Sequence, residues 1–362
     1  MSTTVAHAPS RSQLVSSETE EMEQTLASLR LTGAPTPLAL GSSLEPFARA
    51  DLTPVIGTEF GRGVQLSELL KAPNADDLVR DIAILVSQRN VVFFRDQTLS
   101  IEEQKLLGSK LGELTGKPAS SKLHIHPVTQ EGTENGDEVC PVSSEGLRQY
   151  DAAHADKSAF ASKGWHSDVT FEAVPPDYAV LKMHTIPAVG GDTLWASGYE
   201  VYDRLSPSFA AYLETLEAVH EGRMYHDMMQ SQGKRVRVCE RGSPGNVGAH
   251  LEAVHPIVRT NPVTGWKSVF VNASHTKRIV GVTKDESDMI LNYLYSLVFL
   301  NHDLQVRFRW EKNSIAIWDN RSSFHTGTLD IGNEIRIEDR VMSVGEKPYL
   351  NPKIQSRRQA LD

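Results

Sequence analysis

Short apolar segments broken by Gly, Pro, Asn and Asp fill the chain from residue 124 onward, and they restrict the fold more than any other feature. Runs rich in β-branched and aromatic residues between turn residues are typical of strands. We expect strands at residues 178–184, 191–195, 253–259, 268–271, 304–310, 314–318 and 335–344. Two helices interrupt them, one at 197–205 that extends through 209–217 and one at 284–300. This pattern predicts a mainly β fold with flanking helices, as a barrel or a double sheet.

The first third of the chain has a more helical pattern. The spacing of Leu78, Ile82 and Leu85 predicts a helix over 76–89, which leads into a buried strand at 90–94. Ser100 followed by Glu103 is a capping-box signature for a helix over 100–111, and 66–71 is a shorter helical piece. Residues 1–45 are rich in Ser, Thr, Ala and Glu, so we expect a mobile arm that docks on a neighbouring subunit. A single domain over 46–352 and a C-terminal tail over 353–362 would follow.

The charge balance and the cysteine count exclude several classes of protein. The 37 basic and 46 acidic residues give a net charge of −9, whereas nucleic-acid binding needs an excess of Lys and Arg. No stretch approaches the roughly 18 apolar residues of a membrane span, and the N-terminus has no apolar signal region. Two cysteines, Cys140 and Cys239, cannot frame a disulfide-rich secreted fold, and we expect both to be buried small side chains. A cytoplasmic protein without nucleic-acid or membrane partners is the expectation.

His166 and Asp168 are the first candidate metal ligands. On a strand, residues two apart point to the same face, so this imidazole and carboxylate could converge on one ion. They would supply two ligands of the 2-His-1-carboxylate set that holds non-haem Fe(II). The signal alone is weak, because His250 and Glu252 have the same spacing, and chance gives roughly one or two such matches in a chain of this composition.

The far end of the chain strengthens this interpretation. The segment from Ser314 to His325 predicts a strand that leaves the core and reaches a turn containing the histidine. Arg336 and Arg340 follow eleven and fifteen residues later on the next expected strand. A histidine with cations nearby suits a metal and a dicarboxylate cosubstrate, because a guanidinium binds a carboxylate with two parallel hydrogen bonds.

At these residues the chain resembles the taurine dioxygenase family of Fe(II)/2-oxoglutarate-dependent dioxygenases, including fungal-type sulfonate dioxygenases. The resemblance spans residues 50–350 and is carried by these blocks: Trp165-His-Ser-Asp-Val-Thr-Phe171, Pro175-Pro176, Gly190-Gly-Asp-Thr-Leu-Trp-Ala-Ser-Gly198, Ile315-Ala-Ile-Trp-Asp-Asn-Arg321, Arg340 and Gly345-Glu-Lys-Pro348. It implies a double-stranded β-helix (jelly-roll) core and a homo-oligomer.

The resemblance also implies roles for individual residues. His166, Asp168 and His325 would bind the iron, and Thr193 with Arg336 would bind the distal carboxylate of 2-oxoglutarate. Four further residues would face the substrate: His126, Val169, His275 and Arg340. In this assignment His126, Arg340 and the Val169 backbone hold a sulfonate, and Asp168 excludes the halogenase variant.

The pocket departs from the family pattern at Ser274 and His275, where the family has a Gly-Phe pair. An aromatic wall is thus replaced by a possible hydrogen-bond donor, and the loop at 143–162 looks longer than in the family. The resemblance implies hydroxylation of a carbon in a small anionic substrate, such as taurine, using O2, with succinate and CO2 as coproducts. Three alternatives stay open: the same chemistry on an amino acid or specialised metabolite, a non-catalytic β-helix binding protein, and a zinc hydrolase.

Overall fold

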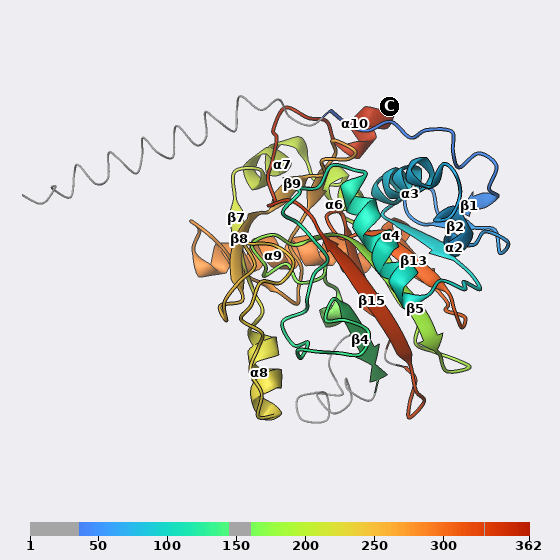
Figure 1. Ribbon diagram of the computed structural model, residues 1–362. Helices are drawn as coiled ribbons and strands as arrows, with labels where there is room; N and C mark the ends of the chain where they lie inside the picture. The colour runs from blue at the N-terminus through green and yellow to red at the C-terminus, as the bar shows by residue number, and fades with distance from the viewer. Residues whose placement is uncertain (1–35, 145–160, 329) are drawn as a thin grey trace, which may run out of the picture. The chain divides into compact units, whose positions relative to one another are not determined.

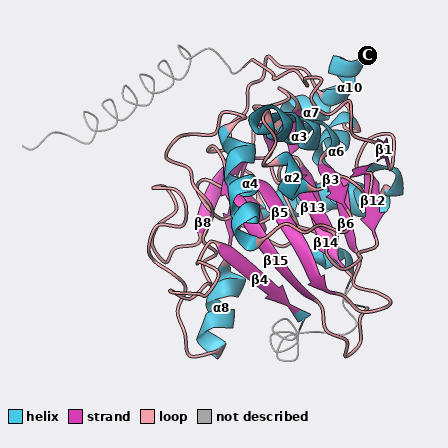
Figure 2. Cartoon of the chain, turned by 45° about the vertical axis from the view of Figure 1, so that its right-hand side comes forward, coloured by secondary structure: helices cyan, strands magenta, loops and turns pink. Residues whose placement is uncertain are grey.

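Two facing sheets carry most strands of this computed structural model, which describes residues 36–144, 161–328 and 330–362. Within these ranges the larger sheet has seven strands: β1 (Arg49–Asp51), β2 (Thr58–Phe60), β3 (Val91–Phe94), β13 (Ile315–Asp319), β5 (Pro176–Thr185), β15 (Ile337–Val344) and β4 (Val139–Ser143), in that spatial order. The smaller sheet has the order β12 (Gln305–Phe308), β6 (Thr193–Ser197), β14 (Ser323–Gly327). Figures 1 and 2 show β4, β15 and β5 side by side.

Smaller elements complete the fold. One further sheet joins β11 (Thr276–Ile279), β7 (Glu217–Glu221) and β8 (Glu252–Pro256), and another joins β10 (Lys267–Val269) and β9 (Val258–Thr260). The α-helices are α2 (Leu66–Leu69), α3 (Ala75–Arg89), α4 (Ile101–Glu113), α6 (Gly198–Asp203), α7 (Pro207–Leu213), α8 (Arg223–Ser231), α9 (Lys284–Leu300) and α10 (Arg357–Leu361). Two short 3₁₀ helices are η1 (Ala161–Gly164) and η2 (His302–Leu304).

The centre of the larger sheet is buried on both faces: every residue of β13 is buried, and successive side chains of this strand point to opposite sides. On β13, Ile315 and Ile317 face the layer of α3 and α4, whereas Ala316 and Trp318 face the smaller sheet. The space between the two sheets is filled by a second cluster that includes Trp195 of β6. A continuous apolar strand of this kind therefore has to lie at the centre of the molecule.

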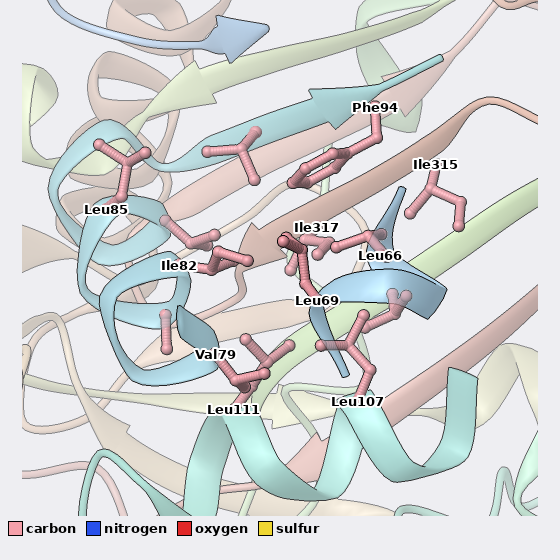
Figure 3. Close-up of a cluster of buried hydrophobic side chains, with 14 of the residues drawn as sticks. Leu66, Leu69, Val79, Ile82, Leu85, Phe94, Leu107, Leu111, Ile315 and Ile317 are labelled. Carbon is pink, nitrogen blue, oxygen red and sulfur yellow. The ribbon is translucent and has the colours of Figure 1, made fainter. Parts of the chain in front are cut away.

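Helices α3 and α4 cover the outer face of the larger sheet. Figure 3 shows Val79, Ile82 and Leu85 of α3 and Leu107 and Leu111 of α4 packed together against this sheet. A complete capping box begins α4, as expected, because Ser100 and Glu103 bond each other's backbone. The apolar stripes that predicted these helices are the faces that bury them.

The outer face of the smaller sheet packs on α6 and α9. Phe324 of β14 lies in one apolar cluster with Leu291 and Leu294 of α9. A capping box of Thr283 and Glu286 fixes the start of α9. The structure thus has helices outside two facing sheets, which confirms a mainly β fold with flanking helices.

Several sequence-based boundaries were wrong. The helix expected through residues 197–217 is broken into α6 and α7, because Pro207 begins a new helix, and Glu217 already belongs to β7. The strand expected at 253–259 is two strands, β8 and β9. Cys239 is exposed and Cys140 is only partly buried, so the expectation that both are buried was also wrong.

Both ends of the expected domain are in contact with its core elements. The described end of the proposed arm contacts the domain, with Leu38 N bonded to Val263 O at 2.8 Å and Leu44 buried in the α3–α4 layer. At the other end, Arg357 of α10 reaches Glu200 of α6 at 3.1 Å. Residues 1–35, and 145–160 of the expected loop, lie outside the described residues. In the described part of the chain, no helix is long and apolar enough to cross a membrane.

Candidate active site

His166, Asp168 and His325 lie together beside the smaller sheet. The backbones of His166 and His325 bond each other in both directions, N to O, at 2.9 and 2.7 Å. Asp168 Oδ1 lies 3.6 Å from His166 Nε2 and 3.7 Å from His325 Nε2. One potential ligand atom from each residue lies within 4.8 Å of the others. The structure therefore brings together the three side chains that the sequence predicted as ligands.

The local structure around these residues differs from the expectation. His325 was expected in a turn, but it lies within β14, whose residues pair with β6. His166 makes an isolated bridge to His325, and Asp168 lies in the turn that follows, so the two residues do not share a regular strand. The convergence of His166 and Asp168 thus comes from this turn.

Buried hydrogen bonds hold the turn in place. Asn320 Oδ1 accepts from Asp168 N at 2.7 Å, and Asn320 Nδ2 donates to Asp168 O at 3.0 Å. Ser167 Oγ donates to Ser323 O at 2.7 Å. Val169 has a φ of +42°, which a β-branched residue adopts only under strain. The surrounding bonds impose this backbone, as is common where a functional group must be aimed.

The electrostatics of the three residues favour a bound cation. Burial raises the pKa of Asp168, but Arg340, His325 and His166 outweigh it and hold that pKa well below its ordinary value. Burial, together with His166, lowers the pKa of His325 to about 3, so its imidazole is neutral near pH 7. The Nδ1 atom of His166 lies 2.8 Å from Gly164 O, a contact that assigns the proton to Nδ1 and leaves Nε2 a free lone pair.

This donor set fits Fe(II). Asp168 Oδ2 is buried and makes no hydrogen bond to any described residue, which is costly for a carboxylate oxygen unless a cation is present. Two imidazoles and one carboxylate form the 2-His-1-carboxylate set that leaves further coordination positions open. The cluster could therefore hold iron and still admit a cosubstrate.

Arg340 and His126 lie next to this cluster. Arg340 Nη1 donates to Asp168 Oδ1 at 2.6 Å, and its Nη2 lies 3.9 Å from Cys140 Sγ. Burial alone would lower the pKa of Arg340, but the charge of Asp168 outweighs burial and the pKa is raised overall, so the guanidinium stays charged. Burial lowers the pKa of His126, and Arg340 lowers it further. A fixed cation beside a neutral imidazole is a suitable site for an anion.

Thr193 and Arg336 form the second polar pair. Thr193 begins β6, and Arg336 immediately precedes β15. Arg336 Nη2 donates to Thr193 Oγ1 at 3.3 Å, and Trp310 Nε1 donates to the same oxygen at 2.9 Å. The structure thus places the two residues in contact, as their expected common role requires.

A cluster of aromatic rings and imidazoles lies beside the candidate metal ligands. Tyr225 of α8 lies 4.9 Å from His126, 5.3 Å from Phe171 and 6.1 Å from His275 between ring centres. The ring of His275 also lies 6.1 Å from that of His166. Burial, with a contribution from His166, lowers the pKa of His275 to about 3, so this imidazole is polar but uncharged near pH 7.

The sequence interpretation missed two residues of this site. Asn320 lies inside a motif that was recognised, but its contact with Asp168 spans 152 residues and has no local signal. Tyr225 lies on α8, a helix that was not predicted because only Met229 of its residues is buried. Neither residue could be found without the three-dimensional arrangement.

Comparisons with known proteins agree with this geometry. The model of the taurine catabolism dioxygenase TauD, TfdA family matches residues 48–342. An alpha-ketoglutarate-dependent dioxygenase, btcD, of Neocamarosporium betae is 44 % identical over 340 residues, with 90 % of this chain and 98 % of that protein covered. An alpha-ketoglutarate-dependent sulfonate dioxygenase of Saccharomyces cerevisiae is 34 % identical over 306 residues, with 83 % and 68 % covered. The crystal structure of a taurine dioxygenase from Burkholderia xenovorans matches with a TM-score of 0.64 at 28 % identity, with 83 % of this chain and 92 % of that chain covered.

Fold and site together define an enzyme, a non-haem iron dioxygenase that depends on 2-oxoglutarate, which is another name for alpha-ketoglutarate. The chain belongs to the TauD/TfdA family of taurine catabolism dioxygenases. Its cofactor is Fe(II) and its cosubstrate is 2-oxoglutarate, as in the rest of this family.

Proposed function

We propose that this enzyme hydroxylates a carbon next to the anionic group of a small substrate, and that this group is a sulfonate. The observation that carries the proposal is the partly buried Arg340, whose Nη1 donates to Asp168 Oδ1 at 2.6 Å and whose charge lowers the pKa of His126. A guanidinium at that position would hold an anion next to the metal ligands, so that the carbon bearing the anion faces the metal.

The residues would divide the work as follows. His166, Asp168 and His325 would hold Fe(II), and Thr193 with Arg336 would hold the distal carboxylate of 2-oxoglutarate. Bound iron would supply activation of O2, coupled to decarboxylation of 2-oxoglutarate to succinate and CO2. The two facing sheets support the expected double-stranded β-helix as the scaffold. We also propose that the enzyme is cytoplasmic and that it forms a homo-oligomer.

Arg340, His126 and Val169 would bind the substrate anion. His126 Nδ1 accepts from Val128 N at 3.4 Å, which leaves the proton on Nε2 as a donor. The strained turn at Val169 would present backbone to the same anion. The rings of Phe171 and Tyr225 would exclude water from the reacting carbon.

The sulfonate is supported by the relative from Saccharomyces cerevisiae, which is named a sulfonate dioxygenase. Hydroxylation of the carbon that bears a sulfonate gives a product that breaks down to an aldehyde and sulfite. Sulfite is therefore a specific product by which a sulfonate substrate is recognised.

A second candidate is the same oxidation of an amino acid or specialised metabolite. His275 favours it, because its buried Nδ1 has no hydrogen-bond partner among the described residues and could bind a polar substrate group. The relative that is 44 % identical is named only a dioxygenase, without a sulfonate.

The test is succinate formation with Fe(II), 2-oxoglutarate and a panel of taurine, other alkylsulfonates, sulfate esters and amino acids. We expect sulfonate-dependent succinate together with sulfite. Turnover with amino acids alone would retain the iron chemistry but reject the sulfonate, and His275→Phe should then raise KM for that amino acid.

Two variants test the division of roles. Arg340→Ala should mainly raise KM for the substrate, and Arg336→Ala should mainly raise KM for 2-oxoglutarate, each by about tenfold or more, because a charged hydrogen-bond partner is lost. If the two effects are exchanged, the roles of the two arginines are exchanged as well.

A further inference from the structure

Glu338 is a buried carboxylate in the middle of this site that has no role in the proposed reaction. It lies on β15 between Arg336 and Arg340, two residues from each, and is 4 % exposed. Its Oε2 lies 2.7 Å from Arg336 Nη2. A buried carboxylate is costly, so its contact with the arginine is the main interaction that offsets its burial.

The contact uses the guanidinium that is assigned to the cosubstrate. Arg336 and Thr193 are the two residues proposed to bind 2-oxoglutarate. Arg336 Nη2 contacts both Thr193 Oγ1 and Glu338 Oε2. Glu338 therefore offers Arg336 a carboxylate where the distal carboxylate of 2-oxoglutarate would bind. Two carboxylates at one guanidinium repel each other, and this repulsion is strong where water is excluded.

The pair is also poorly formed. Although the two atoms are 2.7 Å apart, Glu338 Oε2 has no hydrogen bond of acceptable geometry to any described residue, and Arg336 Nε is likewise buried without an acceptor. Burial raises the pKa of Glu338, although Arg336 and Arg340 oppose this shift. The guanidinium thus keeps unused donor capacity, and an incoming carboxylate with better geometry could take over its contact.

We propose that Glu338 is an internal competitor of 2-oxoglutarate: it occupies Arg336 when the cosubstrate is absent and thereby weakens cosubstrate binding. This inference rests on the proposed role of Arg336. The opposite possibility is that Glu338 positions Arg336 for the cosubstrate. The two roles predict opposite effects when the charge of Glu338 is removed.

The test is the Kd of 2-oxoglutarate for the full-length Mn(II)-loaded protein, measured by calorimetry without turnover. We expect Glu338→Gln to lower this Kd by about fivefold or more, because the variant keeps the shape and removes the repulsion. Glu338→Met should have the same effect, and Glu338→Asp, which keeps the charge, should retain most of the weak binding. An unchanged or higher Kd in both neutral variants overturns the proposal, and a higher Kd establishes a positioning role.

Two controls separate the possible failures. Asp339→Asn removes the neighbouring carboxylate, which pairs with His184 at 2.8 Å, and should leave the Kd unchanged. 2-Oxopentanoate lacks the distal carboxylate, so Glu338→Gln should not tighten its binding. If Arg336→Ala leaves the Kd of 2-oxoglutarate unchanged, the proposed role of Arg336 fails; if that variant weakens binding but Glu338→Gln does not tighten it, only the competitor is rejected.

Discussion

Asp168 shows how one residue can depend on several distant ones. Its backbone is held by Asn320, one carboxylate oxygen accepts from Arg340, and the other is buried without a hydrogen-bond partner among the described residues. The site therefore holds a carboxylate ready for a cation before any cation binds. Such preparation reduces the reorganisation that binding would otherwise require.

Replacing Asp168 by Ala should abolish coupled turnover and weaken metal binding by about 100-fold or more, because an anionic ligand is lost. The measurement is an anaerobic titration with Co(II), followed by its visible absorption. His250→Ala is the matched control, since His250 and Glu252 have the same sequence spacing as His166 and Asp168 but lie elsewhere on the surface. Wild-type activity in the Asp168 variant would show that Asp168 is not a metal ligand.

Asn320 provides a test of the hydrogen bonds around the turn. Asn320→Ala removes two bonds to the Asp168 backbone, and we expect metal affinity to fall by about tenfold to 100-fold. Asn320→Asp keeps the acceptor but not the donor, so it should recover part of the loss. If the alanine variant only lowers the unfolding temperature and binds metal normally, Asn320 is merely structural.

The sequence could predict the candidate metal ligands but not the residues that support them. His166 and Asp168 lie in a motif that carries the resemblance to the TauD/TfdA family, and the expected roles of His325, Thr193 and Arg336 follow from the same resemblance. Asn320 and Tyr225 contact segments that are far apart from them in the chain, and no local pattern marks those contacts.

At the level of elements, local signals predicted the long helices well. The expected helices at 76–89, 100–111 and 284–300 correspond to Ala75–Arg89, Ile101–Glu113 and Lys284–Leu300. Apolar periodicity and capping boxes are contained in the helix itself, so they can be recognised without the rest of the fold. Short strands such as β7 and β14 depend on pairing with distant partners, and therefore β7 was missed and β14 was expected as a turn.

Helix α4 approaches the larger sheet closely at Gly112. A Cβ atom there would lie 2.6 Å from Asp177 Oδ2 and 2.6 Å from Ser343 Oγ, both on fully buried residues. Gly112→Ala should lower the free energy of unfolding by about 1–3 kcal/mol, although alanine is the better helix former, because overpacking outweighs propensity. Urea unfolding measures this change. Ser109→Ala on the same helix is the control, and equal effects of the two substitutions would contradict the close approach.

At the level of the whole molecule, buried neutral histidines make stability depend on pH. Burial lowers the pKa of His255 to about 4 and that of His275 to about 3, and it also lowers the pKa of His220. An unfolded histidine has a pKa of about 6.5, so below that pH the unfolded chain binds more protons than the folded one. Their contribution to stability is therefore complete above about pH 6.5 and is lost as the pH falls towards their folded values.

We expect the free energy of unfolding of the metal-free protein to fall by about 1 kcal/mol per buried histidine between pH 7.5 and 5.5. Asp177 and Glu338 oppose part of this loss, because burial raises their pKa values and the folded state then binds their protons more tightly. Urea unfolding at the two pH values measures the difference. His255→Gln should reduce it by about 1 kcal/mol, whatever its effect on absolute stability, because only the titration of that buried group is removed. Replacement of the exposed His302 should leave the difference unchanged, and an equal reduction in both variants would mean that burial of His255 does not cause it.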